Sequence, residues 1–302
     1  MCKDSIISKA VTILSFYQDF EYLKCMKLCF GVIHSIYPNN SNPCLRMAVA
    51  ICSILASRIH IKHTKEIAES RNIQVLINIV QSKSQEQRED NLLYHSIICL
   101  WNMTDECPVA CARFIEWGGL QCLSQLHKNF QNVQKIDTKI FGLLNNIAEI
   151  STIRHFFLKK NIIRMLLRNA QKGTLPSSFF ACGILANILI CWVKFPDIID
   201  DYNPNDIETI LCKTVNNFGI MNTKEIVVYR SFIPFNELLN SEIYASQWWA
   251  IWSIRHVTKL QKDKYVPLIK NEVNVIQAIR KNLTHEWEGV RFCAKELLDY
   301  LS

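Results

Sequence analysis

Trp101-Asn-Met-Thr-Asp105 and Asn145-Asn-Ile-Ala-Glu149 are the two stretches that decide the fold of this chain. In each, an asparagine stands three residues before the final acid, and the two copies are 44 residues apart. Residues three apart on a helix share one face. The sequence therefore predicts that an asparagine and an acid project from one side of a helix, and that the same helix recurs 44 residues later.

The pattern continues along the chain at a similar spacing. The asparagine of Leu185-Ala-Asn-Ile188 lies 41 residues after Asn146, Leu55-Ala-Ser57 is an earlier copy, and Ile254-Arg-His-Val257 is a later one with His256 in the asparagine position. Armadillo and HEAT repeats have a period of about 40–47 residues. We therefore predict an all-α fold, an armadillo/HEAT-like right-handed helical solenoid whose equivalent helices stack about 8–10 Å apart.

The composition agrees with a helical repeat protein. Of the 302 residues 49% are hydrophobic, enough for a continuous core, and glycine and proline number only 8 each. So few turn-forming residues argue against a β fold with many turns and against a glycine-rich nucleotide fold. We expect residues 1–302 to form a single armadillo-like repeat domain, with residues 1–45 as divergent N-terminal helices or a cap, and 82–87 as a loop.

The 13 cysteines do not have the pattern of a disulfide framework, because they are scattered and odd in number. Free thiols are typical of a reducing compartment. Since no signal peptide follows Met1, we expect a cytoplasmic or nuclear protein. Cys107 and Cys111 have no further Cys or His at a zinc-binding distance, so we expect no metal and no cofactor.

Charge and hydropathy argue against nucleic acid and membrane as partners. The net charge of +7 is small for 302 residues, and the Lys and Arg residues are spread out without interleaved aromatic residues. The most apolar window, between Arg46 and Arg58, is 11 residues long. A helix that crosses a bilayer needs about 20 apolar residues, so this window is interpreted as a buried helix.

The chain carries no enzyme signature. It has neither a Gly-rich phosphate loop nor a serine in a nucleophile elbow. Asp105 and Glu149 could form an acid/base pair for glycoside cleavage, but the sugar cleft expected for that chemistry is missing. We therefore predict a non-catalytic protein.

The repeated motif predicts a binding site instead. If equivalent helices stack, Asn102, Asp105, Asn146 and Glu149 converge with Trp101 on one concave wall, which suits a cationic ligand rich in hydrogen-bond donors. A ladder of polar residues on successive inner helices can also hold an extended peptide. The alternative is that the asparagines only satisfy neighbouring backbone groups. The acid beside each asparagine favours binding for the first two copies, and the later copies leave both readings open.

Six stretches of the chain carry a family resemblance, and they occur in order over residues 45–300. They are Leu100-Trp-Asn-Met-Thr-Asp-Glu-Cys-Pro108, Gly118-Gly119, Gly142-Leu-Leu-Asn-Asn-Ile-Ala-Glu149, Ser178-Phe-Phe-Ala-Cys-Gly-Ile-Leu-Ala186, Tyr229-Arg-Ser-Phe-Ile-Pro-Phe235 and Gln247-Trp-Trp-Ala-Ile-Trp-Ser-Ile-Arg-His-Val257. They resemble the Zyg-eleven and ZER-type family, the armadillo-like substrate receptors of Cullin-2 RING ubiquitin ligases.

This resemblance implies that the chain recognises a protein with a free N-terminal glycine, a Gly/N-degron, for degradation. The implied pocket for the peptide N-terminus is Trp101, Asn102, Asp105, Asn146 and Glu149. Trp101 would form a wall that rejects a large first side chain by steric clash. Candidates for lining the groove beyond the first residue are Phe180, Asn187, Tyr229 and His256. For Phe180 and Tyr229, packing in the core is an equally good reading.

The chain also departs from the family. We find no leucine-rich-repeat register and no leucine four residues before any cysteine, the kernel of the box that recruits elongin and Cullin-2. Asn187 stands where the family more often has histidine, and Arg255 replaces a histidine. Two other functions therefore remain open: a non-catalytic armadillo scaffold or shortened paralogue that binds protein partners without ligase recruitment, and an importin-like carrier of basic peptides. The carrier would need several Trp-Asn pairs, and the chain has one.

Overall fold

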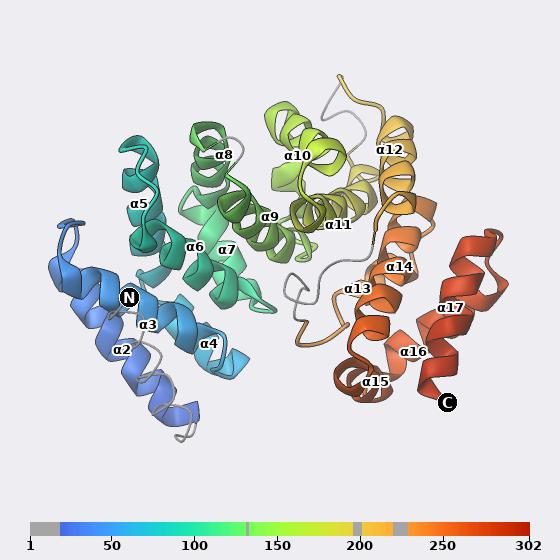
Figure 1. The fold of residues 1–302 in the computed structure, drawn as a ribbon, viewed down its shortest axis with the longest axis horizontal. Helices are drawn as coiled ribbons and strands as arrows, with labels where there is room; N and C mark the ends of the chain where they lie inside the picture. Colours follow the sequence, from blue (N-terminus) through green and yellow to red (C-terminus); the bar gives the residue numbers. More distant parts are fainter. Residues whose placement is uncertain (1–18, 131–132, 196–200, 220–228) are drawn as a thin grey trace. The chain divides into compact units, whose positions relative to one another are not determined.

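The computed structural model describes residues 19–130, 133–195, 201–219 and 229–302, and all regular structure in these ranges is helical (Figure 1). The all-α prediction is thus confirmed. The chain divides into two compact units, residues 1–153 and 154–302. The expectation of one repeat domain over the whole chain stays a prediction, and residues 1–18 of its proposed cap lie outside the described residues.

The first unit is a succession of short and long helices joined by tight turns. Its helices are α2 (Asp19–Ile36), α3 (Pro43–Ala56), α4 (Ile61–Ala68), α5 (Asn72–Gln85), α6 (Asn91–Thr104), α7 (Pro108–Glu116), α8 (Gly119–Asn129) and α9 (Gln134–Ala148). From α4 onward they form two triplets in which a short helix precedes two longer ones, as expected of three-helix armadillo repeats.

The second unit begins with a short 3₁₀ helix, and the elements that follow in its described residues are also helices. Its elements are η1 (Arg154–Phe157), α10 (Lys160–Lys172), α11 (Leu175–Trp192), α12 (Pro204–Asn216), α13 (Phe235–Leu239), α14 (Tyr244–Leu260), α15 (Lys262–Lys270), α16 (Val273–Lys281), η4 (Asn282–Thr284) and α17 (Glu288–Leu301).

Local sequence signals set where the helices of the first unit begin. The side chain of Asn42 accepts a hydrogen bond from the Cys44 amide, and Pro43 occupies the first turn of α3, where its missing N–H is no loss. Asp90 caps α6 in the same way through the Leu93 amide, at 3.0 Å. Gly118, with φ of +74°, turns the chain from α7 into α8 in a conformation that a residue with a side chain rarely adopts.

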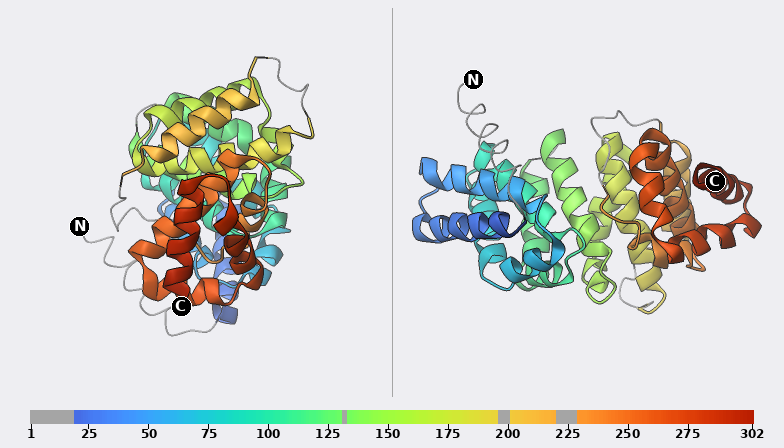
Figure 2. Two further views of the ribbon diagram at one scale, coloured as in Figure 1. Left: turned by 90° about the vertical axis from the view of Figure 1, so that its right-hand side faces the viewer. Right: turned by 90° about the horizontal axis from the view of Figure 1, so that it is seen from below.

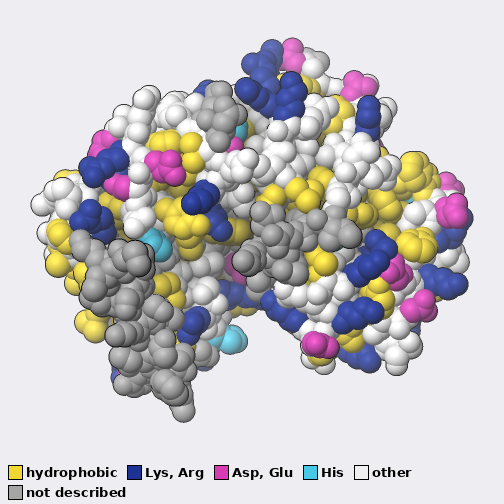
Figure 3. Space-filling model, viewed as in Figure 1, with side chains coloured by type: hydrophobic (Ala, Val, Ile, Leu, Met, Phe, Trp, Pro, Cys, Tyr) yellow, Lys and Arg dark blue, Asp and Glu magenta, His cyan; other side chains and the backbone are white. Residues whose placement is uncertain are grey.

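The helices that end in the repeated motif stack on one another. In the first unit α3 packs on α6 and α6 on α9, while α2 lies beside α3 (Figure 2). In the second unit α11 packs on α14 and α14 on α17. The predicted stacking of equivalent helices is therefore present within each unit. On the face seen in Figure 3, Lys and Arg side chains are interspersed with Asp and Glu.

Helix α11 corrects the sequence-based view of the most apolar segment. It runs for 18 residues from Leu175 to Trp192, longer and more apolar than the window between Arg46 and Arg58. By length and composition it could cross a membrane, and it is the only such helix among the described residues. However, 83% of it is buried inside the protein, against α10, α12 and α14, as in the core helix of a globular unit.

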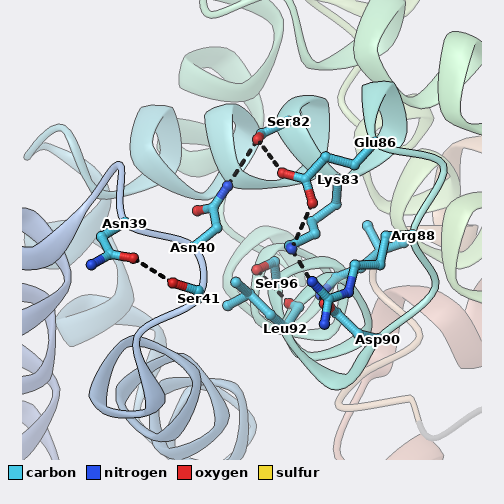
Figure 4. A network of polar contacts seen from close by, with 11 residues as sticks. Asn39, Asn40, Ser41, Ser82, Lys83, Glu86, Arg88, Asp90, Leu92 and Ser96 are labelled. Atoms are coloured by element: carbon cyan, nitrogen blue, oxygen red, sulfur yellow. Dashed lines mark hydrogen bonds and ion pairs between the residues drawn. The ribbon is translucent and has the colours of Figure 1, made fainter.

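The loop predicted at residues 82–87 is wrong for residues 82–85, because α5 continues to Gln85 and the turn follows at Glu86 and Gln87. The reason is Lys83, whose side chain is only 2% exposed and pairs with Glu86 at 2.9 Å and with Asp90 at 3.3 Å (Figure 4). Both acids come after the last residue of α5. They pair with the ammonium of Lys83 because the helix extends to residue 85 and brings this side chain close to them. Since Asp90 also caps α6, this network joins the end of α5 to the start of α6.

We predict that Lys83→Ala lowers the free energy of unfolding by about 1–3 kcal/mol, because it removes both a buried ion pair and the packing of the aliphatic stem. Lys83→Met keeps most of the stem and should lose less. Urea unfolding followed by circular dichroism measures both, and Lys62→Ala, on the exposed face of α4, is the control expected within about 0.5 kcal/mol of wild type. Equal effects of all three variants would contradict the network's role.

Candidate functional site

The predicted pocket residues of the first unit gather where α6 and α9 end. Helix α6 ends at Thr104, and Asp105 follows in an extended conformation. Helix α9 ends at Ala148, and Glu149 follows it with helical torsion angles. The C-terminal end of a helix carries a partial negative charge of about half an electron. Two such ends and two carboxylates therefore contribute negative potential to one region.

The turn after Asp105 is unusual in its backbone. Glu106 has φ of +53°, in the left-handed region that side chains disfavour, and Pro108 then starts α7 as the sequence indicates. Because the chain turns immediately after Asp105, this residue lies at the C-terminal end of α6 and the helix does not continue past it.

The two asparagines of the motif are held by backbone carbonyls of the preceding stacked helix. Asn102 donates through Nδ2 to the carbonyl of Ser53 at 2.9 Å, and Asn146 donates through Nδ2 to the carbonyl of Trp101 at 3.0 Å. The alternative reading, that these side chains satisfy neighbouring backbone groups, is thus correct for their donors. It also sets their orientation, because a carbonyl can only receive the NH₂ end of the amide.

The amide oxygens are the acceptor atoms of these two side chains. Since Nδ2 of each amide is turned to a carbonyl, Oδ1 is the atom that can accept from a further donor. Asn102 is half-buried and Asn146 is 8% exposed. The two side chains therefore present hydrogen-bond acceptors, as the two carboxylates do.

Asn145 is a site residue that the sequence analysis missed. It is 2% exposed and donates through Nδ2 to Oε1 of Glu149 at 2.7 Å, across one turn of helix. This bond holds the carboxylate over the end of α9. The sequence signal for Asn145 was the pair of adjacent asparagines in the motif. Neighbouring side chains on a helix point in different directions, so the two amides contact different partners.

The thiol of Cys111 lies at the C-terminal ends of α6 and α9. Its sulfur lies 3.2 Å from the carbonyl oxygen of Thr104 and 3.8 Å from that of Asn146. Burial raises the pKa of Cys111 far above its usual range, and the charges of Cys107, Glu149 and Asp105 act in the same direction. Asp105 and Glu149 thus both act to raise the pKa of one buried thiol at these two helix ends.

Trp101 lies against α9 because of a glycine. A Cβ on Gly142 would stand 2.5 Å from Cζ2 of the indole, so only glycine lets the ring lie this close to the helix. Lys139 places its ammonium 4.7 Å from the ring centre, and burial lowers its pKa. A lysine of the protein thus already supplies a cation–π contact to the indole. Neither Gly142 nor Lys139 was singled out from the sequence as a support for Trp101.

The four candidate groove residues belong to the second unit. Phe180 is 3% exposed and its ring meets Phe179 edge-on. Asn187 is fully buried and donates to the carbonyl of Gly183 at 3.0 Å in its own helix.

Tyr229 and His256 are likewise part of an aromatic interior. Tyr229 is half-buried and packs edge-on against Phe235. His256 is 7% exposed and stacks on Trp252 at 4.6 Å, and burial lowers its pKa. These contacts are those of core residues, and a role of the four residues in a peptide groove stays a prediction.

Comparison with known proteins places the chain in a family. Residues 5–301 match the family model described as protein zer-1 homolog-like, C-terminal domain. The chain belongs to the zer-1 homolog-like family. The resemblance seen in the motifs is thus confirmed over almost the whole chain.

Relatives in the zer-1 homolog-like family are distant in sequence. The proteins called protein zer-1 homolog from mouse and human are each 25% identical over 257 residues, 84% of this chain and 32% and 33% of theirs. Zyg eleven-related protein 1 of Caenorhabditis elegans is 23% identical over 263 residues, 85% of this chain and 28% of its own length. The chain spans about a third of the length of these relatives.

Solved structures with a similar fold include engineered proteins. One engineered protein is 15% identical with a TM-score of 0.49, covering 93% of this chain and 96% of its own. A designed armadillo repeat protein is 14% identical with a TM-score of 0.47, covering 93% of this chain and 99% of its own.

We predict that Gly142→Ala destabilises the first unit by about 1–3 kcal/mol, because the new methyl group displaces Trp101 from α9. Urea unfolding measures the change. Gly31→Ala in α2 is the matched control, since a Cβ there meets nothing within 4 Å and alanine favours a helix by about 1 kcal/mol. If both variants gained stability alike, the close contact of Trp101 with Gly142 would be wrong.

Proposed function

We propose that the ends of α6 and α9 bind the free amino terminus of a polypeptide that begins with glycine. The proposal is supported by Asp105 and Glu149, which follow the C-terminal ends of the packed helices α6 and α9, and by the two motif asparagines, whose Nδ2 atoms face backbone carbonyls and leave Oδ1 as acceptor. Every one of these groups accepts hydrogen bonds or attracts positive charge. A primary ammonium, compact and with three N–H donors, matches that set.

Other cations fit the site less well. A guanidinium is planar and binds two oxygens of one carboxylate side by side, whereas these acceptors come from separate helices. A metal ion would need close ligands, and no group of three or more His, Cys, Asp or Glu among the described residues is arranged to hold one. Two cations remain, the amino group at a peptide N-terminus and the amino group of a lysine side chain. Of the two, we favour the peptide N-terminus as the ligand of this half-buried site.

The preference for glycine follows from Trp101. The indole is fixed between Gly142 and Lys139, so it cannot move aside cheaply to admit a side chain. A rigid indole beside the first Cα has room for the hydrogen of glycine. It excludes larger side chains by steric clash, so part of the specificity comes from repulsion.

The wider role rests on the family. We propose that the chain is the substrate-recognition module of a Cullin-2 RING ubiquitin ligase, a non-catalytic receptor that presents Gly/N-degron proteins for degradation. The competing proposal is an armadillo scaffold or shortened paralogue that binds protein partners without the ligase. The two differ in whether the chain co-purifies with the elongin and Cullin-2 complex, and both are compatible with amine binding.

We expect a fluorescent Gly-initiated peptide to bind with micromolar affinity, and its N-acetylated twin to show at least tenfold weaker binding, because acetylation removes the charge and two donors. Fluorescence polarisation measures both. Asp105→Asn and Glu149→Gln should each weaken binding about 10–100-fold, the loss of one hydrogen bond to a charged group.

Glu69→Gln is the matched control, since Glu69 is an exposed acid that follows the end of α4 and should not affect binding. A peptide beginning with leucine should bind at least tenfold more weakly than the glycine peptide. Equal affinity for the free and acetylated peptides would contradict amine recognition and leave the scaffold proposal.

Binding should also depend on pH in one direction. The α-amino group of a peptide has a pKa of about 8, so the ammonium is fully present below pH 7 and lost above pH 8. We expect constant affinity between pH 6 and 7 and a fall of about tenfold per pH unit above 8, measured by polarisation at fixed ionic strength. Affinity that stays constant from pH 6 to 9 would rule out the ammonium as the recognised form.

A further inference from the structure

The outer side of helix α10 carries a row of cations, which we call the basic row. Lys160, Arg164, Arg168 and Lys172 follow one another at intervals of four residues, and all four are exposed. Residues four apart on a helix lie on one face, and α10 contains no acidic residue. One group of the Lys and Arg side chains drawn in Figure 3 lies over α10, at the upper edge of the view. The helix therefore presents a uniformly positive face to solvent.

The basic row differs from other charged positions on the surface. Lys24 pairs with Glu21, and Arg113 pairs with Glu116, each within one turn of its own helix. By contrast, the last three cations of the basic row have no acidic partner among the residues that the structure describes. Like charges four residues apart repel one another and destabilise a helix. A row of uncompensated cations is therefore better explained by a ligand than by the stability of α10.

A carboxylate of this chain indicates what kind of group the basic row can bind. Asp201, in the segment that leads into α12, forms an ion pair with Lys160 in the first turn of α10. Both side chains are about half exposed, so the contact is made at the surface. A carboxylate carried by a polypeptide can thus reach the row, and in the described part of the chain it occupies the first of the four cations.

The spacing of the basic row matches that of an extended peptide. Residues four apart in an α-helix are separated by about 6.0 Å along the axis, because each residue rises by about 1.5 Å. In an extended chain every second side chain points to the same side, and these are separated by about 6.6 Å. The row winds around α10 by about 40° per step, which long Lys and Arg side chains can span. Acids at alternate positions of an extended chain can therefore meet successive cations.

Nucleic acid and membrane match this face less well. Sites for single-stranded nucleic acid combine positive charge with aromatic side chains on which the bases stack, and α10 has no aromatic residue. A helix that lies on a membrane inserts its apolar side into the lipid. The apolar side of α10, with Ile162, Ile163 and Leu166, is instead buried inside the second unit. An acidic polypeptide remains the favoured ligand.

We propose that the basic row is a docking site for an acidic segment of a partner protein, bound in an extended conformation with Asp or Glu at alternate positions. Arg164 and Arg168 form its centre, and each guanidinium can hold a carboxylate through two parallel hydrogen bonds. Because these ion pairs form at an exposed surface, binding is sensitive to salt. The row lies in the second unit, so this site does not depend on the amine pocket of the first.

The probe for this site is an N-acetylated decapeptide of alternating Glu and Ser with a fluorescent label at its C-terminus. Acetylation removes the ammonium that the pocket of the first unit would recognise. We expect fluorescence polarisation to show binding at about 10 mM NaCl, and at least about threefold weaker binding at about 150 mM. A peptide of the same composition, with all Glu residues first, should bind more weakly. No binding at low salt would overturn the site, and equal affinity of the two peptides would overturn the match of spacings.

A double variant tests the centre of the basic row. Arg164→Gln combined with Arg168→Gln should weaken binding of the alternating peptide about 3–30-fold, through the loss of two surface ion pairs. Lys62→Gln combined with Lys65→Gln is the matched control, because it removes the same charge from exposed positions on α4 and should change the affinity less than about twofold. If the control weakened binding as much as the arginine pair, net charge alone would explain the attraction and the proposal would fail.

Asp201→Asn tests the site in the opposite direction. It releases Lys160, so the alternating peptide should bind about 1.5–5-fold more tightly than to wild type, a gain that misfolding cannot imitate. An unchanged affinity would contradict the role of Lys160 in the row. Tighter binding of a single-stranded oligonucleotide of equal charge, or of phosphatidylserine vesicles, would overturn an acidic polypeptide as the ligand.

Discussion

The rest of the site depends on one interaction, the hydrogen bond from a motif asparagine to a backbone carbonyl of the preceding stacked helix. Asn102 makes it to Ser53 and Asn146 makes it to Trp101, so each bond sets the register between two helices of the stack. Each such bond contributes about 0.5–1.5 kcal/mol, which favours this orientation of the amide. The same bond turns the amide oxygen outward. The structural role and the proposed binding role therefore belong to the two ends of one side chain.

The two carboxylates of the site lie at positions where a negative charge destabilises a helix. An acid near the C-terminal end of a helix is unfavourable by about 0.3–1 kcal/mol, because the helix dipole is negative there. Asp105 and Glu149 both occupy such positions, and each lies near the buried Cys111. Places where local rules are broken are often functional sites. The proposed ammonium ligand would bring a positive charge to both of these positions.

The supports of the pocket were harder to find than its members. The 44-residue offset identified Asn102 and Asn146 because equal spacing is visible in one dimension. Gly142, which lets Trp101 lie on α9, and Asn145, which holds Glu149, act through contacts between side chains whose approach depends on helix packing. The same limit explains why residues 82–85 were wrongly predicted as loop. A run of polar residues is typical of a loop, whereas here Lys83 pairs with acids that follow the helix and supports its last turn.

By itself the sequence determined the fold class, the family and the helix that carries each motif, since periodicity and spacing are properties of one chain read in order. Only the tertiary structure decided which end of each asparagine faces the protein and that α11 is a buried core helix. The physical reason is the same in both cases: the direction of a hydrogen bond and the burial of a helix depend on which helix lies alongside, and packing determines that.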